Sequence, residues 1–421
     1  MSALAVSGAD GFLARYEGLK ARLPGDAAER EAAAGAFRAA GLPGVRQEAW
    51  RYTNLKPVAE VAFHEAMSAL ADCAGLLALL PDIDAPRLIF VDGRFRADLS
   101  SLPDGVDVGT FARAPGFGTL AHPERDALVA LNTMLAEDGA TISVPEGRDG
   151  GTLVLASLGS DAAGHPVAFH PRHSIHLARG AKLTVVDVSV GTGTYLHNPV
   201  ISVQVEPDAA LTHVRLQDES PSAFHLAMLY ADVAARGTYD SFSLSLGARL
   251  ARSEVRVNLG GSRGLVHLNA AQLLGGVQHG DFTTVVRHDA PACASRQTVK
   301  NVLAGRARGV FQGRIEVARV AQKTDGYQMN QALLLSPEAE IDSKPELEIF
   351  ADDVKCSHGA TVGELDPAQL FYLRSRGVPE AEARTILVRA FLAEALDVVA
   401  DESVRAALDV AVQRWWERQA S

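Results

Sequence analysis

Two short stretches, Ile201-Ser-Val-Gln-Val-Glu206 and Ser241-Phe-Ser-Leu-Ser-Leu246, decide how the 421-residue chain is expected to fold. In each stretch apolar and polar residues alternate with a period of two. This alternation is typical of a strand that buries one face and exposes the other to water. Val255-Arg-Val-Asn-Leu259 repeats the pattern. We therefore expect a β-rich core in which the alternating serines face water.

The strands recur at a fixed distance along the sequence. Apolar positions in one series are 28 residues apart, and a second series with the same period is offset by about 15 residues. The two series are Val186, Val214, Phe242, Ala270 and Ile201, Leu229, Val257, Val285. Such a period is typical of a solenoid whose repeating unit contains two strands and two bends. Equivalent residues would then stack roughly 4.8 Å apart in successive coils.

Hairpin signals are missing between these strands, which argues against a β-sandwich. Sandwich strands usually follow one another about every 8 to 12 residues, across tight Asn-Gly or Asp-Gly turns. The nonapeptide repeat of calcium-binding β-helices is also missing. The alternative is a chance coincidence of Val and Leu in a hydrophobic chain, and the agreement of eight positions argues against it.

Helical periodicity dominates both ends of the chain. We therefore divide it into an N-terminal helical region, a mixed connecting segment, a parallel β-helix core and a C-terminal helical domain, at residues 1–85, 86–150, 151–365 and 366–421. Asp366 can cap the first C-terminal helix. The C-terminal helices could close the open end of the β-helix, whose unpaired strand edges invite aggregation, or they could form a docking surface.

Apolar stripes are expected on two of the C-terminal helices. One contains Ile386, Leu387, Ala390 and Phe391, and the other contains Val404, Leu408, Ala411, Val412 and Trp415. Near the N-terminus, residues 47–57 hold a Trp, a Tyr and two cations within a few positions. We interpret this segment as an aromatic latch that packs the N-terminal helices onto the next domain.

Charge and composition narrow the class of protein. Acidic residues outnumber basic ones 51 to 40, which gives a formal net charge of -11 and argues against a nucleic-acid partner. No stretch reaches the roughly 18 apolar residues that a membrane span requires. The N-terminus lacks the apolar core of a signal peptide. Three scattered cysteines allow neither a disulfide framework nor a zinc motif, so we expect a reducing, cytoplasmic environment.

Motifs for nucleotide hydrolysis or a nucleophile elbow do not occur in the sequence. His170, His173 and His176 form the only local histidine cluster, and we interpret it as a bend between coils in preference to a metal site. His213 and His267 are expected on wet faces. Cys73 and Cys293 are expected in the core.

The densest group of reactive residues is Val354-Lys-Cys-Ser-His358. If this stretch is extended, Cys356 and His358 project to the same face. A thiolate and an imidazole side by side can share a soft metal ion, or the imidazole can lower the thiol pKa. Two ligands do not complete a tetrahedral site. The alternative is that Cys356 is a small core residue and that His358 is hydrogen-bonded.

Several long motifs surround this group, and one more lies near the N-terminus. They are Gly309-Val-Phe-Gln-Gly-Arg-Ile-Glu-Val317, Ala321-Gln-Lys-Thr-Asp-Gly-Tyr-Gln-Met-Asn-Gln-Ala-Leu-Leu-Leu-Ser336, Pro345-Glu-Leu-Glu-Ile-Phe-Ala-Asp-Asp-Val-Lys-Cys-Ser-His-Gly-Ala-Thr361, Leu370-Phe-Tyr-Leu-Arg-Ser-Arg-Gly377 and Glu48-Ala-Trp-Arg-Tyr-Thr53. Together they resemble the SufB/SufD family of iron–sulfur cluster assembly proteins, and the similarity is close over residues 280–395. The length and the shortage of cysteine are most similar to the SufD branch.

This resemblance implies a right-handed β-helix between two helical regions. It further implies a non-catalytic scaffold that pairs with a SufB-like subunit and binds a SufC-like ATPase through its C-terminal helices. His358, with Cys356 beside it, would lie at the partner interface as a nascent cluster or iron site. The chain alone is expected to hold no cofactor, the iron–sulfur cluster being transient in the complex, and a homodimer is an option in isolation.

Two other hypotheses stay open within this sequence, besides a SufB-type cluster scaffold. A carbohydrate-active β-helix enzyme would need paired carboxylates, and Asp352 and Asp353 are a poor pair because neighbouring residues of a strand point to opposite faces. A free-standing metal-binding protein would rest on Cys356 and His358 alone. We expect little metal in the isolated chain on that basis.

Overall fold

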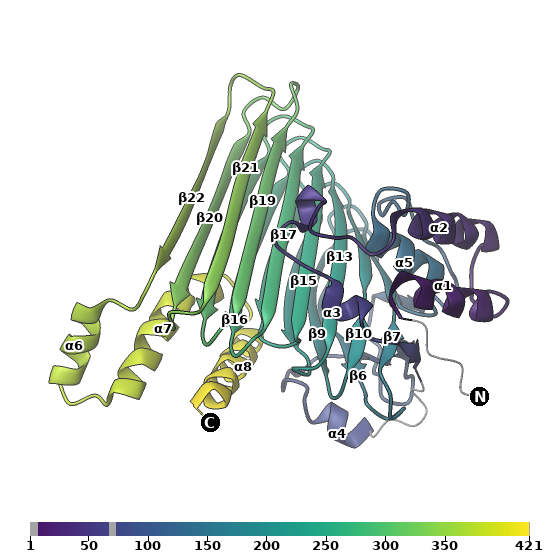
Figure 1. Cartoon of the computed structure of the whole chain (residues 1–421). Helices are drawn as coiled ribbons and strands as arrows, with labels where there is room; N and C mark the ends of the chain where they lie inside the picture. The colour runs from purple at the N-terminus through teal and green to yellow at the C-terminus, as the bar shows by residue number, and fades with distance from the viewer. Residues whose placement is uncertain (1–6, 67–72, 421) are drawn as a thin grey trace.

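The computed structural model describes residues 7–66 and 73–420 and shows a stack of strands with helices toward both ends (Figure 1). Successive long strands alternate between two sheets, and each pairs in parallel with the strand one coil earlier and one coil later. The predicted parallel β-solenoid with flanking helices is therefore confirmed.

Within the described residues, sheet A has 12 strands and sheet B has 10. Sheet A contains β1 (His64–Glu65), β4 (Asp107–Thr110), β5 (Ala140–Val144), β7 (Val167–Phe169), β8 (Arg172–Leu177), β10 (Tyr195–His197), β11 (Val200–Val205), β13 (Phe224–Val233), β15 (Leu250–Leu259), β17 (His279–His288), β19 (Arg308–Val317) and β21 (Glu340–Ile349). Sheet B contains β2 (Arg87–Val91), β3 (Arg94–Phe95), β6 (Asp149–Gly159), β9 (Lys182–Gly191), β12 (Ala210–Asp218), β14 (Thr238–Ser245), β16 (Leu265–Leu274), β18 (Ala294–Leu303), β20 (Asp325–Leu334) and β22 (Lys355–Gly363).

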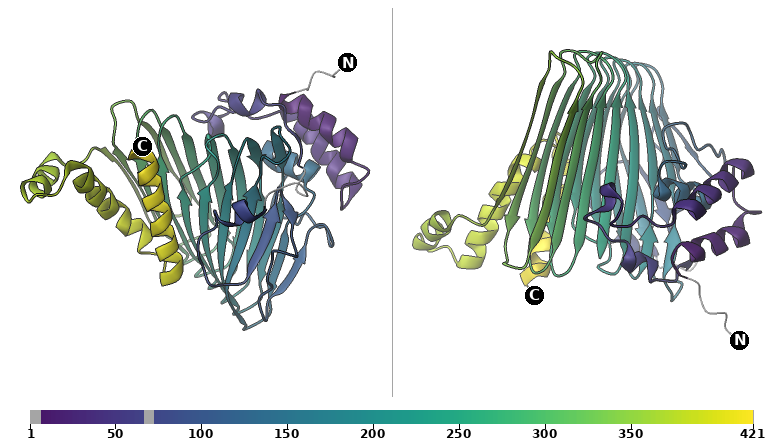
Figure 2. Two further views of the ribbon diagram at one scale, coloured as in Figure 1. Left: turned by 90° about the horizontal axis from the view of Figure 1, so that it is seen from below. Right: turned by 45° about the horizontal axis from the view of Figure 1, so that its top comes forward.

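Helices flank this solenoid toward its two ends, as Figure 2 shows. The N-terminal elements are α1 (Gly8–Leu19), α2 (Ala27–Ala40), the 3-10 turn η1 (Glu48–Trp50), α3 (Lys56–Ala59), α4 (Cys73–Leu77) and α5 (Ala127–Leu135). The C-terminal helices are α6 (Pro367–Ser375), α7 (Glu380–Leu396) and α8 (Glu402–Ala420). Asp366 caps α6 as expected, since its Oδ1 accepts from the Ala368 amide at 2.8 Å.

The 28-residue period is confirmed for the first complete coils. Val214 pairs with Val186 on one side and with Phe242 on the other, and Ile201 pairs with Leu229. Because pairing is parallel and in register, residues one period apart stack directly above each other.

The period then changes, and the later members of both series were predicted wrongly. Leu229 pairs with Val255 instead of Val257, Phe242 pairs with Asn269 instead of Ala270, and Val257 pairs with Val286 instead of Val285. The physical reason is that successive coils differ in length: β14 has 8 residues and follows the bend at residues 234–237, whereas β16 has 10 residues and follows the longer bend at residues 260–264. A single fixed period therefore holds only while the lengths of strands and bends are constant.

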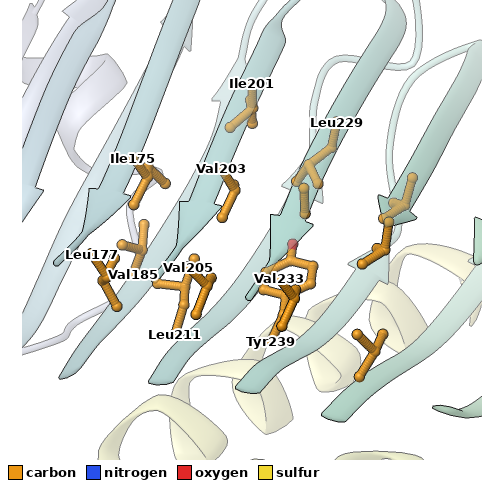
Figure 3. Packing of buried hydrophobic residues seen from close by; sticks show 14 of the residues in the cluster. Ile175, Leu177, Val185, Ile201, Val203, Val205, Leu211, Leu229, Val233 and Tyr239 are labelled. Atoms are coloured by element: carbon orange, nitrogen blue, oxygen red, sulfur yellow. The ribbon is translucent and has the colours of Figure 1, made fainter. Parts of the chain in front are cut away.

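The main core lies between the two sheets (Figure 3). Ile201, Val203 and Val205 of β11 point into it and pack with Leu229 of the next coil and Leu211 of the opposite sheet. All five side chains are at most 2% exposed. The buried face predicted for this stretch is therefore correct.

The other alternating stretch, residues 241–246, differs from its prediction. Ser241 and Ser243 are buried, at 2% and 8% exposure, and do not face water. Phe242 and Leu244 pack into a separate cluster that includes α7 and α8. Both faces of β14 are covered because the C-terminal helices lie on the outer surface of sheet B.

The last helix buries the predicted stripe, and Trp415 at its centre has no exposed surface. The stripe predicted for α7 is wrong in part. Ile386 is 41% exposed, whereas Val388 and Leu392 are fully buried against sheet B. Since these helices cover a face of sheet B, they do not close the end of the solenoid.

The predicted aromatic latch is a strap, residues 48–53, that lies along the outer face of sheet A. The Arg252 guanidinium lies 4.1 Å from the Trp50 ring centroid, and Thr53 Oγ1 lies 2.9 Å from His279 Nε2. Gln312 Nε2 donates to the Ala49 carbonyl at 3.2 Å, and Lys344 Nζ lies 2.8 Å from Glu48 Oε1. The strap therefore contacts four neighbouring strands of sheet A, namely β15, β17, β19 and β21.

We predict that Trp50→Ala lowers the free energy of unfolding by about 3 kcal/mol, because it removes a buried indole and leaves a cavity beside Arg252. Urea denaturation measures this change. The neighbouring Arg51→Ala is the control and should stay within about 0.5 kcal/mol of the wild type, because Arg51 is exposed. Equal effects of the two substitutions would contradict the role of the strap.

Candidate functional site

The candidate site lies on β22, the last strand of the solenoid. Within the described residues, β22 pairs only with β20, and β21 pairs only with β19, so both sheets end in an open edge. Cys356 and His358 are two positions apart in β22 and therefore share a face, as predicted. Val354 precedes the strand instead of lying in it.

Cys356 is half-buried in a small apolar cluster with Ile315, Val317 and Leu347. Its Cα partner in β20 is Gly326, and a Cβ at that glycine would lie 3.3 Å from Cys356 Sγ. The glycine therefore makes room for the thiol. Burial raises the pKa of Cys356, so the thiol is protonated near neutral pH unless a cation or a partner surface changes its surroundings.

His358 is exposed, and its ring has no hydrogen-bond or ion-pair partner among residues 7–66 and 73–420. The alternative of a hydrogen-bonded structural histidine is thus not what the structure shows. In register with it, Gln328 of β20 is fully buried and its Oε1 lacks a hydrogen-bond partner in the described chain. Polar atoms with unused bonding capacity therefore gather at this edge.

The rim of the open end is apolar as well. Phe350, which follows β21, is 66% exposed, and Val362 of β22 is 55% exposed. Exposed apolar residues beside unpaired main-chain groups are typical of an interaction surface. Chemically, the edge offers one imidazole and one thiol to a soft or borderline metal ion, and any further ligands would have to come from a facing molecule.

The other histidines named from the sequence have structural roles. His170 lies in the bend before β8, where its Nδ1 is 3.0 Å from Asn198 Oδ1, and His173 Nδ1 accepts from the Ala140 amide at 2.9 Å. Burial lowers the pKa of His173 to about 4, so the ring is neutral. His176 is on β8 but points away from His173. The interpretation of this cluster as a bend is therefore correct for His170 only, because His173 and His176 lie within strand β8.

His213 was predicted on a wet face and is instead fully buried, with Nδ1 3.2 Å from the Tyr239 hydroxyl. It points into the solenoid, because the face of sheet B that lies opposite carries the apolar residues covered by α7 and α8. His267 is half-buried, within 3.7 Å of Asp240.

The remaining predictions concern two cysteines and a pair of neighbouring aspartates. Cys293 is a core residue at 1% exposure, as expected, and its Sγ donates to the Gly261 carbonyl at 3.2 Å. Cys73 is half-buried beside the outer cluster of sheet B, 3.1 Å from Arg96 Nη1. Asp352 and Asp353 lie exposed in the bend before β22, where Asp353 pairs with Lys323.

The sequence reasoning missed one group of possible ligands, His197, Glu219 and His225, which meet inside the solenoid. The signal that could have revealed them is the 28-residue spacing of the two histidines, which equals the period of the coil and makes them Cα partners. Separately, none of the helices in the described ranges is long and apolar enough to cross a bilayer.

Comparison with known proteins agrees with this architecture. Residues 159–391 match the family model described as "SUF system FeS cluster assembly, SufBD core domain", and residues 26–150 match "SufBD protein N-terminal region". The chain is 34% identical to "Iron-sulfur cluster assembly protein SufD" of Escherichia coli over 87% of each chain. It is 30% identical to "Protein ABCI7, chloroplastic" of Arabidopsis thaliana, over 89% of this chain and 83% of the relative.

A cyanobacterial relative is similar over a comparable length. This protein, "Iron-sulfur cluster assembly SufBD family protein slr0076" of Synechocystis, is 29% identical over 88% of this chain and 87% of its own. The core match includes β22, the strand that carries Cys356 and His358, and the N-terminal match includes the strap. The chain therefore belongs to the SufBD family of iron–sulfur cluster assembly proteins.

Proposed function

We propose that this chain is the SufD-like scaffold subunit of a complex with a SufB-like scaffold and a SufC-like ATPase. Membership of the family gives it a role in iron–sulfur cluster assembly. The observation that carries the finer proposal is the exposed, unpartnered His358 beside the Cys356 thiol on an open strand edge. Such an edge can offer ligands to a cluster that a second subunit completes.

The proposed SufB-like partner docks at this open end. The edges of β21 and β22 leave main-chain donors and acceptors available for further pairing, and Phe350 and Val362 supply apolar area around them. A facing scaffold with the same solenoid cross-section could continue both sheets. In the absence of that partner, a second copy of this chain could occupy the same edge as a homodimer.

The proposed ATPase contact lies on the C-terminal helices. Helix α6 has no buried residue, yet it exposes Phe371 and Tyr372 at 73% and 58%. Large aromatic side chains on an exposed helix are frequent anchors of protein interfaces. Ile386 of α7, at 41% exposure, adds to the same apolar character.

In this proposal the chain has no catalytic role, and no cofactor stays on the Cys356 and His358 pair without the partner. The cluster would form there transiently as the product of the complex. A reducing cytoplasmic compartment suits a chain with three scattered cysteines. A carbohydrate-active enzyme is not favoured, because Asp353 is engaged by Lys323 and the family match covers the whole solenoid end.

Co-expression with the two presumed partners should give one stable complex in size-exclusion chromatography. Phe350→Asp should shift the SufB-like subunit out of this complex, because it places a charge in the apolar rim. Thr361→Asp places the same charge on an exposed residue of β22 and should release less of the SufB-like subunit. It tests whether a negative charge alone is sufficient to break the contact. If the wild-type chain elutes alone or only as a homodimer with both partners present, the proposal is wrong.

His358→Ala should leave the complex intact and lower the yield of iron–sulfur cluster in anaerobic reconstitution by at least about tenfold, by analogy with the loss of a metal-site residue. Absorbance and iron and sulfide analysis measure the yield. His176→Ala, another partly exposed strand histidine far along the chain, should change neither quantity. An unchanged cluster yield in His358→Ala would make this residue structural.

Phe371→Asp should weaken binding of the ATPase subunit by at least about tenfold if α6 supplies an anchor, while leaving the fold intact because the side chain is exposed. Titration calorimetry on the purified proteins measures the affinity. Gln369→Ala, an exposed substitution on the same helix, is the control. Normal affinity in both Phe371→Asp and Ile386→Asp would place the contact elsewhere.

A further inference from the structure

Three buried side chains with metal-ligand chemistry converge inside the solenoid. They are His197 at the end of β10, Glu219 in the bend after β12 and His225 near the start of β13, and one ligand atom of each lies within 4.8 Å of the other two. The shortest contacts run from Glu219 Oε1 to His197 Nδ1 at 3.0 Å and from Glu219 Oε2 to His225 Nδ1 at 2.7 Å. The three side chains are at most 7% exposed.

Strand pairing holds this group in place. His197 and His225 are Cα partners in the parallel pairing of β10 with β13, so their rings lie one coil apart, edge to face, with centroids 5.0 Å from each other. Gln217 Nε2 donates to Glu219 Oε2 at 3.0 Å and fixes the orientation of the carboxylate. Donors that are positioned by the main chain in this way are pre-organised for an ion.

The carboxylate lacks a fixed positive partner. Within the described residues, the ion-pair contacts of Glu219 are with His197 and His225, and no lysine or arginine lies within ion-pair distance. Arg215, which lines the neighbouring cavity, donates from Nη2 to Ser243 Oγ at 2.7 Å. Because burying an uncompensated carboxylate costs several kcal/mol, a proton or a metal cation must balance it.

One feature favours the metal cation over a proton alone. The His225 ring approaches Glu219 without the alignment of a hydrogen bond, so its short contact is not a normal donor–acceptor pair and leaves Nδ1 of His225 with unused bonding capacity. His197 faces Glu219 with Nδ1, and its other ring nitrogen, Nε2, has no partner in the described chain and would donate to a water molecule when Nδ1 binds the ion.

A cavity adjoins the site on one side and a surface depression adjoins it on the other. An internal cavity of about 40 Å³ is lined by His197, His225 and Gln217, which is room for about three water molecules as further ligands or as acceptors for the imidazoles. On the other side, Glu219 lines a surface depression together with Ser220 and Trp415.

We propose that His197, Glu219 and His225 bind one divalent first-row transition-metal ion. Two imidazoles and a carboxylate, with positions left for water, form a donor set that suits Zn²⁺ and Fe²⁺. Ligands at about 2.0 to 2.2 Å from such an ion lie about 3.3 Å apart, so the present contacts need to open by well under 1 Å. The ion would link β10, β13 and the bend after β12. This site contains no residue of the proposed partner-dependent pair on β22.

Metal retention by the purified full-length chain tests this site. The chain is stripped with a chelator, loaded with Zn²⁺ in one arm and anaerobically with Fe²⁺ in the other, desalted and analysed for metal. We expect one ion per chain in at least one arm, with a melting temperature that rises with the concentration of that ion. Loading with Co²⁺ should give visible d–d bands without the near-ultraviolet band of a thiolate ligand.

Matched variants assign the ion to these residues. Glu219→Gln and His225→Gln should weaken retention by at least about tenfold, whereas His213→Gln, another buried histidine of the interior, and the double variant Cys356→Ala/His358→Ala should retain the ion. If the wild type holds well below one ion per chain in every arm, or if folded Glu219→Gln binds as the wild type does, the group is a protonated hydrogen-bond network and the proposal is wrong. Should the variants not fold, the Co²⁺ spectrum and stoichiometry of the wild type decide the question, because a thiolate band would assign the ion elsewhere.

Discussion

Main-chain hydrogen bonding between equivalent residues of successive coils is the constraint on which the rest of this structure depends. Each long strand satisfies its donors and acceptors on the coil before and the coil after, so the stack can grow but cannot close on itself. Sheets A and B therefore end together at β21 and β22. Helices cover the outer faces and leave this edge open, and for that reason Cys356 and His358 are accessible there.

The sequence was sufficient to predict the solenoid, because Val186, Val214 and Phe242 keep a constant spacing while the bends are constant. It also placed Cys356 and His358 on one face from their two-residue separation alone. It could not show which face of β14 is inside. Alternation reveals that Ser243 and Leu244 face opposite ways, but here helices cover the outer face, so the apolar residue is outside and the serine inside.

The internal group of His197, Glu219 and His225 marks a second limit of sequence reasoning. The two histidines are one period apart and could have been paired by the same arithmetic that located the strands. Glu219 could not, because it lies in a bend, and the geometry of bends in this chain follows no period. Polar residues inside the coil are tolerated where neighbouring coils supply partners, as Ser243 does for Arg215.

The strap at residues 48–53 affects how the solenoid can unfold from its open end. In a simple solenoid each coil contacts only its neighbours, so the stack can fray one coil at a time from a free end. Here a single short segment is anchored at Arg252 near the middle and at Lys344 on the last coil of sheet A. Loss of the terminal coil then also requires release of a segment that belongs to the other end of the chain. The strap thus links the two ends of the chain, so that local unfolding of the open edge is cooperative with detachment of the N-terminal helices.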